Sequence, residues 1–474
     1  MSEPIYDIAV IGAGVVGAAI ARDLSRHKVK VVLIESGADV GVGTSKANTA
    51  IWHTGFDAKP GTLEARLLRR GTELLGDFVA EAGIPAQRLG ALLVAWNDTE
   101  LEALEGIQKN AEANGYSRTR RVAADELAAL EPDLGPGALG ALSVPDEGII
   151  CPFTMPLALA TQAVLNGVEL LLDSPVGAIE QHDEAHVLKI GGSFPKELRA
   201  RYVVNSAGLF SDAVDRMFGH DGFTVTPRRG ELIVFDKLAA RLVSHILLPV
   251  PTKMGKGVLV SPTVFGNVML GPTAEDIDDK AGTQTTSAGL EFLRAKGQHI
   301  VPALLEEEVT ATYAGLRAAT EHSDYQVAAH AGQRYICVGG IRSTGLSACL
   351  GISEHVCGLL ADCGLELAPT DDVVAVHMPV IGEADLRPYQ DAEAIRRDSR
   401  YGRVVCHCER VTEGEIADAC RAPIPARTVD GLRRRTRSTL GRCQGFYCSA
   451  HVVELMAEAS GRRPGALLGL EDQR

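Results

Sequence analysis

The sequence lacks any feature that would carry it into or across a membrane. No uninterrupted apolar stretch approaches the roughly 18 residues that a spanning helix needs. Met1 to Asp7 contains neither a basic stretch nor an apolar core, so we expect no secretory signal. Solenoid repeats and long low-complexity segments are also missing. These absences predict a cytoplasmic protein, whose attachment to a membrane would have to come through a partner.

Positive charge and cysteine are both scarce. Lysine and arginine together number 47, against 61 aspartates and glutamates, which gives a net charge of −14. Nucleic acids and anionic membranes repel such a chain, so neither is expected as the main partner. Only 10 of the 474 residues are cysteine, and without a secretory signal we expect reduced thiols rather than a disulfide framework. The length predicts two or three domains.

A βαβ pattern opens the chain. Ile5 to Ile11 is a β-rich run, Val16 to Leu24 has apolar residues at helical spacing, and Lys28 to Ile34 returns to a strand. Glycines separate the first strand from the helix. This unit is typical of a dinucleotide-binding domain.

The glycines between strand and helix follow a dinucleotide fingerprint. Gly12 permits a tight turn, Gly14 lets the backbone approach a pyrophosphate, and Gly17 allows close packing of helix on strand. Glu35 closes the second strand, where a carboxylate can bind a ribose 2′-hydroxyl and would repel the 2′-phosphate of NADP. The pattern leaves NAD and FAD both open, and a glycine-rich turn without a ligand is the alternative.

Four cysteines near the C-terminus form two close pairs. Cys406 and Cys408 are followed after 34 residues by Cys443 and Cys448, which lead into an apolar helix around Val452 to Met456. Four thiolates suit a [2Fe–2S] cluster or a structural zinc ion. Zinc modules more often use C-x2-C pairs, so the spacing favours iron–sulfur, and a site without metal is the third possibility. A dinucleotide site and a cluster in one chain indicate a redox enzyme.

The most basic stretch follows in the same region, at Arg433 to Arg435 with Arg437 and Arg442. Its simplest interpretation is a solvated helix face. The alternatives are compensation of an anionic cluster and a docking surface for an acidic partner.

Family resemblance favours FAD over NAD. Thr44 to Phe56 (TSKANTAIWHTGF) resembles the flavin-facing loop of the D-amino-acid-oxidase-like FAD enzymes, in particular their glycerol-3-phosphate dehydrogenase and L-2-hydroxyglutarate oxidase branches. Further stretches that resemble this superfamily are 205–212, 253–276 and 339–346 (GGIRSTGL). The likeness covers roughly residues 5 to 365.

The resemblance implies an α/β fold with a Rossmann-like FAD-binding domain, an inserted α+β substrate domain and a small C-terminal iron–sulfur domain. The FAD-binding domain is expected from about 1–85, 145–215 and 325–365, the substrate domain from about 86–144 and 216–324, a linker at 366–400, the iron–sulfur domain at 401–455 and a tail at 456–474.

The cysteine region resembles a second family. Val405 to Glu409 and Cys443 to Cys448 are similar to the two ligand loops of the bacterioferritin-associated-ferredoxin-like [2Fe–2S] domain. That domain occurs at the C-terminus of anaerobic glycerol-3-phosphate dehydrogenase subunits and of some amino-acid dehydrogenases. The resemblance implies that Cys406, Cys408, Cys443 and Cys448 hold the cluster.

The fingerprint and the resemblance together imply the site residues. His53 is the expected proton acceptor, with a structural histidine as the alternative. Arg317 is the expected anchor for an anionic substrate, and Lys253, Lys256 and Arg342 are further cationic candidates. The expected FAD-binding residues are Gly12, Gly14, Gly17, Glu35, Thr44, Ser45, Asn48, Thr49, Ala207, Gly208, Gly340, Ile341, Gly345 and Leu346.

We therefore expect an FAD-dependent dehydrogenase that oxidises a small anionic secondary alcohol. The best candidate reaction converts sn-glycerol 3-phosphate to dihydroxyacetone phosphate, with electrons passing through the cluster to a partner subunit or the quinone pool. L-2-hydroxyglutarate and an amino acid of the proline or hydroxyproline kind are the rival substrates. From a different class, the chain could be an electron-transfer or assembly subunit without a substrate of its own.

Overall fold

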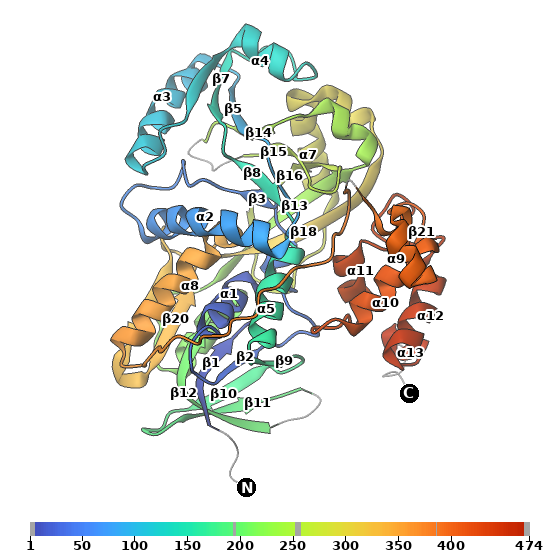
Figure 1. The fold of residues 1–474 in the computed structure, drawn as a ribbon. Helices are drawn as coiled ribbons and strands as arrows, with labels where there is room; N and C mark the ends of the chain where they lie inside the picture. Colours follow the sequence, from blue (N-terminus) through green and yellow to red (C-terminus); the bar gives the residue numbers. More distant parts are fainter. Residues whose placement is uncertain (1–4, 193–195, 252–256, 385, 469–474) are drawn as a thin grey trace.

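Two large β-sheets organise the chain in the computed structural model, which describes residues 5–192, 196–251, 257–384 and 386–468 (Figure 1). The first sheet has eight strands in the order β10-β11-β12-β1-β2-β9, with β20 also on β12 and β19 on β20. These strands are β1 (Ile5–Ile11), β2 (Val31–Ile34), β9 (Glu169–Leu171), β10 (Val176–Glu180), β11 (His186–Ile190), β12 (Lys196–Asn205), β19 (Gln326–His330) and β20 (Tyr335–Gly339).

The centre of this sheet is parallel, and its strands end level with one another. Ile11 at the end of β1 pairs in register with Ile34 of β2 and Asn205 of β12, and Asn205 pairs with Cys337 of β20. The carboxyl ends of four strands therefore meet at one edge, which is where ligands bind in open α/β sheets. The strands expected at 5–11, 201–205 and 335–338 are confirmed, although β12 begins earlier than its apolar run indicates.

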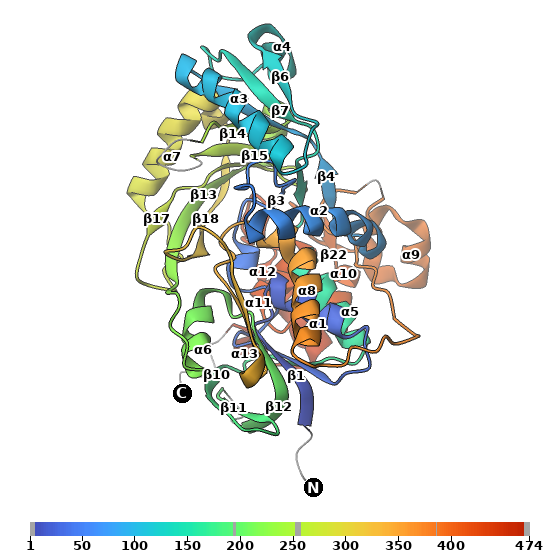
Figure 2. The ribbon, with the colours of Figure 1, turned by 90° about the vertical axis from the view of Figure 1, so that its left-hand side faces the viewer.

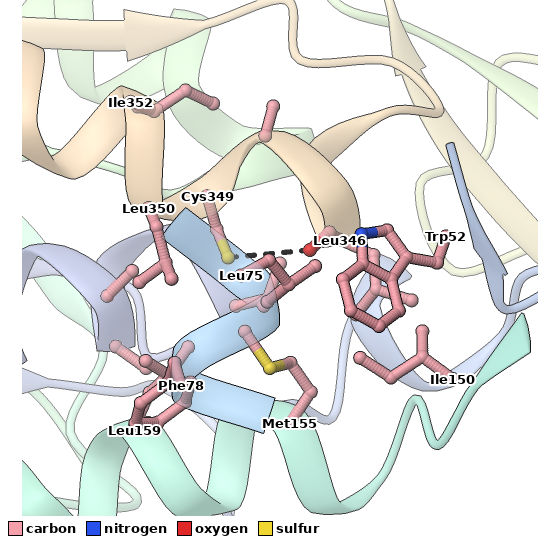
Figure 3. Close-up of a cluster of buried hydrophobic side chains, with 14 of the residues drawn as sticks. Trp52, Leu75, Phe78, Ile150, Met155, Leu159, Leu346, Cys349, Leu350 and Ile352 are labelled. Carbon is pink, nitrogen blue, oxygen red and sulfur yellow. Dashed lines mark hydrogen bonds between the residues drawn. The ribbon is translucent and has the colours of Figure 1, made fainter. Parts of the chain in front are cut away.

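Helices α1 (Val15–Leu24), α2 (Leu63–Ala82), α5 (Thr154–Leu165) and α8 (Gly345–Asp362) pack against one another beside this sheet (Figure 2). Figure 3 shows part of their shared core, where Leu75 and Phe78 of α2 meet Met155 of α5 and Cys349 of α8, all nearly or fully buried. The Cys349 thiol donates to the Leu346 carbonyl at 3.4 Å, as expected for a cysteine with a packing role. Among the described residues, no helix is both long and apolar enough to span a bilayer.

The second sheet has nine strands in the order β17-β13-β16-β15-β14-β5-β7-β6, with β18 also on β13. Its strands are β5 (Ala91–Ala95), β6 (Arg120–Ala123), β7 (Gly140–Val144), β13 (Thr226–Phe235), β14 (Ile246–Pro249), β15 (Leu259–Pro262), β16 (Val268–Gly271), β17 (Glu275–Asp276) and β18 (Val309–Ala319). Helices α3 (Asp98–Ala113), α4 (Ala124–Leu130) and α7 (Ser287–Ile300) accompany it, and α6 (Ser211–Met217) follows β12 in the first sheet.

A small sheet connects segments that are far apart in the sequence. β8 (Gly148–Ile150) pairs with both β3 (Ile51–Trp52) and β4 (Ala86–Arg88). Trp52 lies opposite Gly148 in the register, so the residues next to them, His53 and Glu147, become neighbours.

The C-terminal part forms a separate small core at the side of the molecule (Figure 1). It contains β21 (Val404–Cys406), β22 (Val411–Thr412), α10 (Glu413–Arg421), α11 (Val429–Thr436), α12 (Ser449–Ser460) and α13 (Pro464–Leu467). We call residues 404–458 the cysteine module. Cys420 is buried on α10 and lies outside the two cysteine pairs.

The segment at 366–400 is more ordered than its charged composition indicates. Val376, Met378 and Ile381 are buried. The helix α9 (Ala392–Arg397) is capped by Asp391, whose side chain accepts hydrogen bonds from the amides of Glu393 and Ala394. Similarly, the described residues of the expected tail complete α12, with Met456 fully buried, and form α13.

Candidate active site and cysteine module

One large cavity, of about 2000 Å³, connects the carboxyl edge of the first sheet to strands β13 and β18 of the second. His53, Arg317 and Arg342 line it together with most of the expected FAD-binding residues, which are Gly12, Gly14, Glu35, Thr44, Ser45, Asn48, Thr49, Ala207, Gly208, Ile341, Gly345 and Leu346. Gly17 and Gly340 lie behind the lining. Lys253 and Lys256 lie outside the described residues.

The fingerprint glycines are required by close backbone contacts. Gly12 has φ of +99°, and a Cβ atom there would lie 2.5 Å from the Ser206 carbonyl oxygen. A Cβ atom on Gly17 would lie 1.9 Å from the Gly12 carbonyl oxygen. A side chain at either position would force the β1–α1 turn apart, so the glycines hold the N-terminus of α1 at the cavity wall.

Glu35 ties the end of β2 to the same turn. Its carboxylate accepts hydrogen bonds from the amides of Ala13 and Gly37, both at 2.8 Å. The carboxylate is largely buried and lines the cavity. This geometry fits a carboxylate that binds the ribose of a dinucleotide.

The loop 44–49 packs over the start of α1. The Ser45 hydroxyl accepts from the Val15 amide at 2.9 Å, and the Thr44 hydroxyl donates to the Leu316 carbonyl of β18 at 2.7 Å. The loop thus joins the dinucleotide edge of the first sheet to the second sheet.

The stretch 339–346 leads into the N-terminus of α8, where Gly345 and Leu346 line the cavity. Arg342 in this loop forms an ion pair with Glu64, which also accepts from the Thr344 hydroxyl at 2.8 Å. Its positive charge is therefore already neutralised, which makes Arg342 a weaker candidate for an anion anchor than Arg317.

His53 is held from two sides. Its amide donates to the Ser347 hydroxyl at 2.9 Å, and its ring nitrogen Nδ1 lies 3.1 Å from Glu147 Oε2. Glu147 is fully buried, and its other oxygen accepts from the amide and hydroxyl of Thr54 at 2.6 and 2.9 Å. The sequence did not single out Glu147 as a site residue, because no spacing rule connects a glutamate to a histidine 94 positions earlier.

Arg317 is a half-buried cation on β18. Burial, and then the neighbouring Arg228, lowers the pKa of its guanidinium. Its hydrogen bond to the Thr273 carbonyl is long, at 3.5 Å, and no carboxylate of the described residues forms an ion pair with it. Gly230 provides the space, since a Cβ atom there would lie 3.0 Å from the guanidinium. Such a cation attracts an anion into the cavity.

The cysteine module brings the four expected thiols together from two loops. Cys406 and Cys448 are buried, Cys443 is half-buried and Cys408 is exposed. The amide of Tyr447 makes the largest contribution to lowering the pKa of Cys443, with help from Cys408, while burial and Cys406 raise the pKa of Cys448 to about 12. The described side chains form no set of three that would hold a single metal ion. Four mutually interacting thiols are nevertheless the ligand set of a two-iron cluster.

The arginine run joins this module to the rest of the chain, so its interpretation as a solvated helix face is wrong. Arg434 and Arg435 are buried and donate to Asp39, with distances of 2.6–2.8 Å. Arg437 donates to Glu409 at 2.7 Å, next to Cys408. Arg442 pairs with Glu308 at 2.6 Å. The positive charges of this run are thus compensated largely by carboxylates of the same chain.

Two known families match this sequence. A profile described as FAD dependent oxidoreductase matches residues 7–359, and one described as BFD-like [2Fe-2S] binding domain matches residues 404–458. The chain belongs to the FAD-dependent oxidoreductase family. Both resemblances drawn from the sequence are confirmed, and so is the fold class.

The oxidoreductase is similar over nearly its whole length to a glycerol 3-phosphate dehydrogenase from Caloramator mitchellensis, with 37% identity over 96% of this chain and 95% of that protein. It is 28% identical to human mitochondrial L-2-hydroxyglutarate dehydrogenase, over 58% of this chain and 62% of the relative. The solved structure of L-α-glycerophosphate oxidase from Mycoplasma pneumoniae with FAD bound matches with a TM-score of 0.75 and 29% identity, over 80% of this chain and 100% of that one.

FAD is therefore the cofactor of this oxidoreductase, and its C-terminal domain is of the [2Fe–2S] type. The residues present fit FAD, because the glycine turn, the Glu35 carboxylate and the start of α8 all line one large cavity. They also fit a cluster, through the four thiols of the module.

Proposed function

We propose that this oxidoreductase is a dehydrogenase that converts sn-glycerol 3-phosphate to dihydroxyacetone phosphate. The observation that carries the proposal is that His53 and Arg317, which forms no ion pair with a described carboxylate, line one cavity with the FAD-binding turn. The full-length similarity to a protein named glycerol 3-phosphate dehydrogenase supports the same substrate.

In this proposal Arg317 binds the phosphate group. Its planar fork of N–H donors can contact two phosphate oxygens at once. The substrate anion compensates a charge that burial disfavours, so binding relieves an existing cost.

His53 accepts the proton of the C2 hydroxyl through Nε2, since Nδ1 faces Glu147. Bound FAD supplies the acceptor for the hydride from C2. The fully buried Glu147 and the Ser347 hydroxyl fix the histidine before substrate arrives.

We further propose the domain boundaries given by the resemblance, with the four module cysteines as cluster ligands. Electrons leave through this module to a partner subunit or the quinone pool rather than directly to oxygen. Cys408 is exposed, which supports access of an acceptor to that end of the module. Contact with a membrane, where it occurs, comes through the partner.

An anaerobic absorbance titration of the purified protein tests the substrate. Glycerol 3-phosphate should bleach the flavin absorbance stoichiometrically. Bleaching by L-2-hydroxyglutarate alone would overturn the proposal and assign the chain to the hydroxy-acid enzymes, with Arg317 holding a carboxylate. The similarity to L-2-hydroxyglutarate dehydrogenase makes that acid the second candidate. Bleaching by neither donor, nor by proline, would favour a subunit without a substrate.

A further inference from the structure

Glu147 is a buried carboxylate whose surroundings are specific. One oxygen, Oε1, accepts from the amide and the hydroxyl of Thr54, and the other, Oε2, lies 3.1 Å from His53 Nδ1. The residue has no exposed surface. Burying a carboxylate is costly unless its oxygens are hydrogen-bonded, and here each oxygen has a partner.

The position of Glu147 follows from strand pairing. β3 ends at Trp52 and β8 begins at Gly148, and these two residues face each other in antiparallel register. His53 follows one strand and Glu147 precedes the other. The register therefore places the side chains of His53 and Glu147 next to each other. Arg88 on the adjacent β4 adds a positive charge near the Glu147 carboxylate.

We propose that Glu147 is the positioning residue that makes His53 a proton acceptor, an inference that rests on the proposed function. A carboxylate only accepts hydrogen bonds, so it selects the tautomer with the proton on Nδ1. The lone pair of Nε2 is then left for the substrate hydroxyl, whose O–H bond breaks as the Nε2–H bond forms. The carboxylate also stabilises the resulting imidazolium.

The two Thr54 donors make Glu147→Gln a sharp test. They hold the oxygen of the introduced amide at the Oε1 position, because only that atom can accept from them. The amide NH₂ group must then face His53 and donate to Nδ1. This reverses the tautomer and places the proton on Nε2, where the ring can no longer accept one, although the shape of the side chain is unchanged.

A second histidine–glutamate pair supplies a matched control. His245 Nδ1 lies 2.6 Å from Glu131, which is also buried and accepts from the amides of Ser244 and His245. Neither residue is among the described lining of the cavity. Glu131→Gln changes a similar buried pair without touching the active site.

Nitrogen-15 NMR of the histidine-labelled holoenzyme at alkaline pH tests the tautomer without any substrate, with His53→Asn identifying the His53 signals. We expect His53 to carry its proton on Nδ1 in the natural protein and on Nε2 in Glu147→Gln. In Glu131→Gln the tautomer of His53 should be that of the natural protein. A natural protein with the proton on Nε2, or an unchanged tautomer in Glu147→Gln, would overturn the inference.

Stopped-flow reduction by glycerol 3-phosphate tests the consequence. Glu147→Gln should lower the limiting rate of flavin reduction by about 10²- to 10⁴-fold. Substrate affinity should stay within a few-fold. The double variant with His53→Asn should be no slower than His53→Asn alone, since residues that act as a unit are not additive. If the rate losses of the two single variants instead add in the double variant, Glu147 acts independently of His53, and the inference is overturned. If the natural protein is not reduced at all, the proposed function fails while the NMR result still decides the tautomer.

Discussion

At the scale of single residues, the candidate site contains one cation, Arg317, that forms no ion pair with a carboxylate of the part of the chain described. Arg228 and Arg229 next to Arg317 form ion pairs with Asp276 and Glu275, so the nearby carboxylates are already engaged. Arg317 keeps a net charge in a half-buried position, and burial lowers the pKa of its guanidinium. Such residues reduce stability in exchange for function.

Arg317→Gln should therefore weaken binding and strengthen the fold. We expect at least about a tenfold loss of affinity for glycerol 3-phosphate, because a charge-assisted hydrogen bond contributes about 1.5–3 kcal/mol. The melting temperature should rise or stay constant. Arg22→Gln is the control, since burial also lowers the pKa of Arg22 but Arg22 hydrogen-bonds Gln162 at 2.6 Å and pairs with Asp23. Arg22→Gln should lower the melting temperature. A similar fall in the melting temperature of Arg317→Gln would contradict the view that burial of Arg317 costs stability.

At the scale of secondary-structure elements, two contacts position the carboxyl edge of the first sheet, where the expected FAD-binding residues lie. Gly17 brings α1 onto the turn after β1, and Asp39, in the loop after β2, receives two arginines from the cysteine module. A Cβ atom on Gly431 of α11 would lie 2.9 Å from the Asp39 carboxylate, so the helix rests directly on this loop. The loop that leads from β2 to Thr44 and Ser45 is thus held by the cysteine module at Asp39 and by hydrogen bonds to Leu316 and Val15 at its end.

Gly17→Ala should abolish FAD retention, because its methyl group would overlap the Gly12 carbonyl oxygen. Gly76→Ala on α2 is the control, since a Cβ atom there meets nothing within 4 Å. In a helix that change should stabilise by up to about 1 kcal/mol. Flavin content after purification measures both, and a Gly17→Ala protein with full flavin would contradict the packing argument.

Asp39→Asn should loosen the module in a pH-dependent way. Burial raises the pKa of Asp39, but the hydrogen bonds and charges of Arg435 and Arg434 outweigh it and lower the pKa below the ordinary value of 3.8. The stabilisation by these ion pairs is therefore complete above about pH 4 and is lost as the pH falls through the lowered pKa.

We expect the substitution to reduce the free energy of unfolding by about 3–5 kcal/mol at pH 7, because it leaves two buried arginines without their charge partner. The difference from the natural protein should shrink in acid. Asp173→Asn, which breaks the more exposed pair with Arg427 at 3.0 Å, should cost less than about 1 kcal/mol. If denaturant titrations gave the two variants equal losses in the free energy of unfolding, the buried ion pairs of Asp39 would not hold the module more strongly than an exposed pair does.

At the scale of the whole molecule, the cysteine module contacts both halves of the oxidoreductase. Asp39 and Lys46 belong to the part that carries the first sheet, whereas Arg437 stacks on Phe265 at 3.9 Å and Arg442 pairs with Glu308 beside the second. The module therefore contacts both of the parts between which the cavity lies, and Figure 1 shows it at one side of the molecule.

Cys408→Ser should separate the two half-reactions. We expect loss of iron, sulfide and cluster absorbance, with flavin bleaching by substrate retained and turnover with a quinone analogue reduced at least about tenfold. Cys420→Ala, in the same module but outside the thiol group, is the control and should keep the cluster. Unchanged quinone turnover after cluster loss would contradict electron exit through the module.

Local rules made much of this molecule predictable from its sequence. The strand at Ile5–Ile11, the glycine turn and Glu35 follow from short-range patterns of hydrophobicity and backbone freedom, and the cysteine spacing likewise depends on neighbours in the chain. The partners of the arginine run and the structure within 366–400 were not predictable, because both depend on surfaces hundreds of residues away.

Motifs a few residues long were enough to identify the family and the cofactor, because such motifs can be read without knowing the fold. Which of the described charges have an opposite charge beside them became visible only in the folded chain. Strand pairing set Glu147 against His53, and ion pairs among the described residues engage Arg342 but not Arg317. The physical reason is that the energy of a charge depends on its burial and its nearest partner, and long-range pairing fixes both.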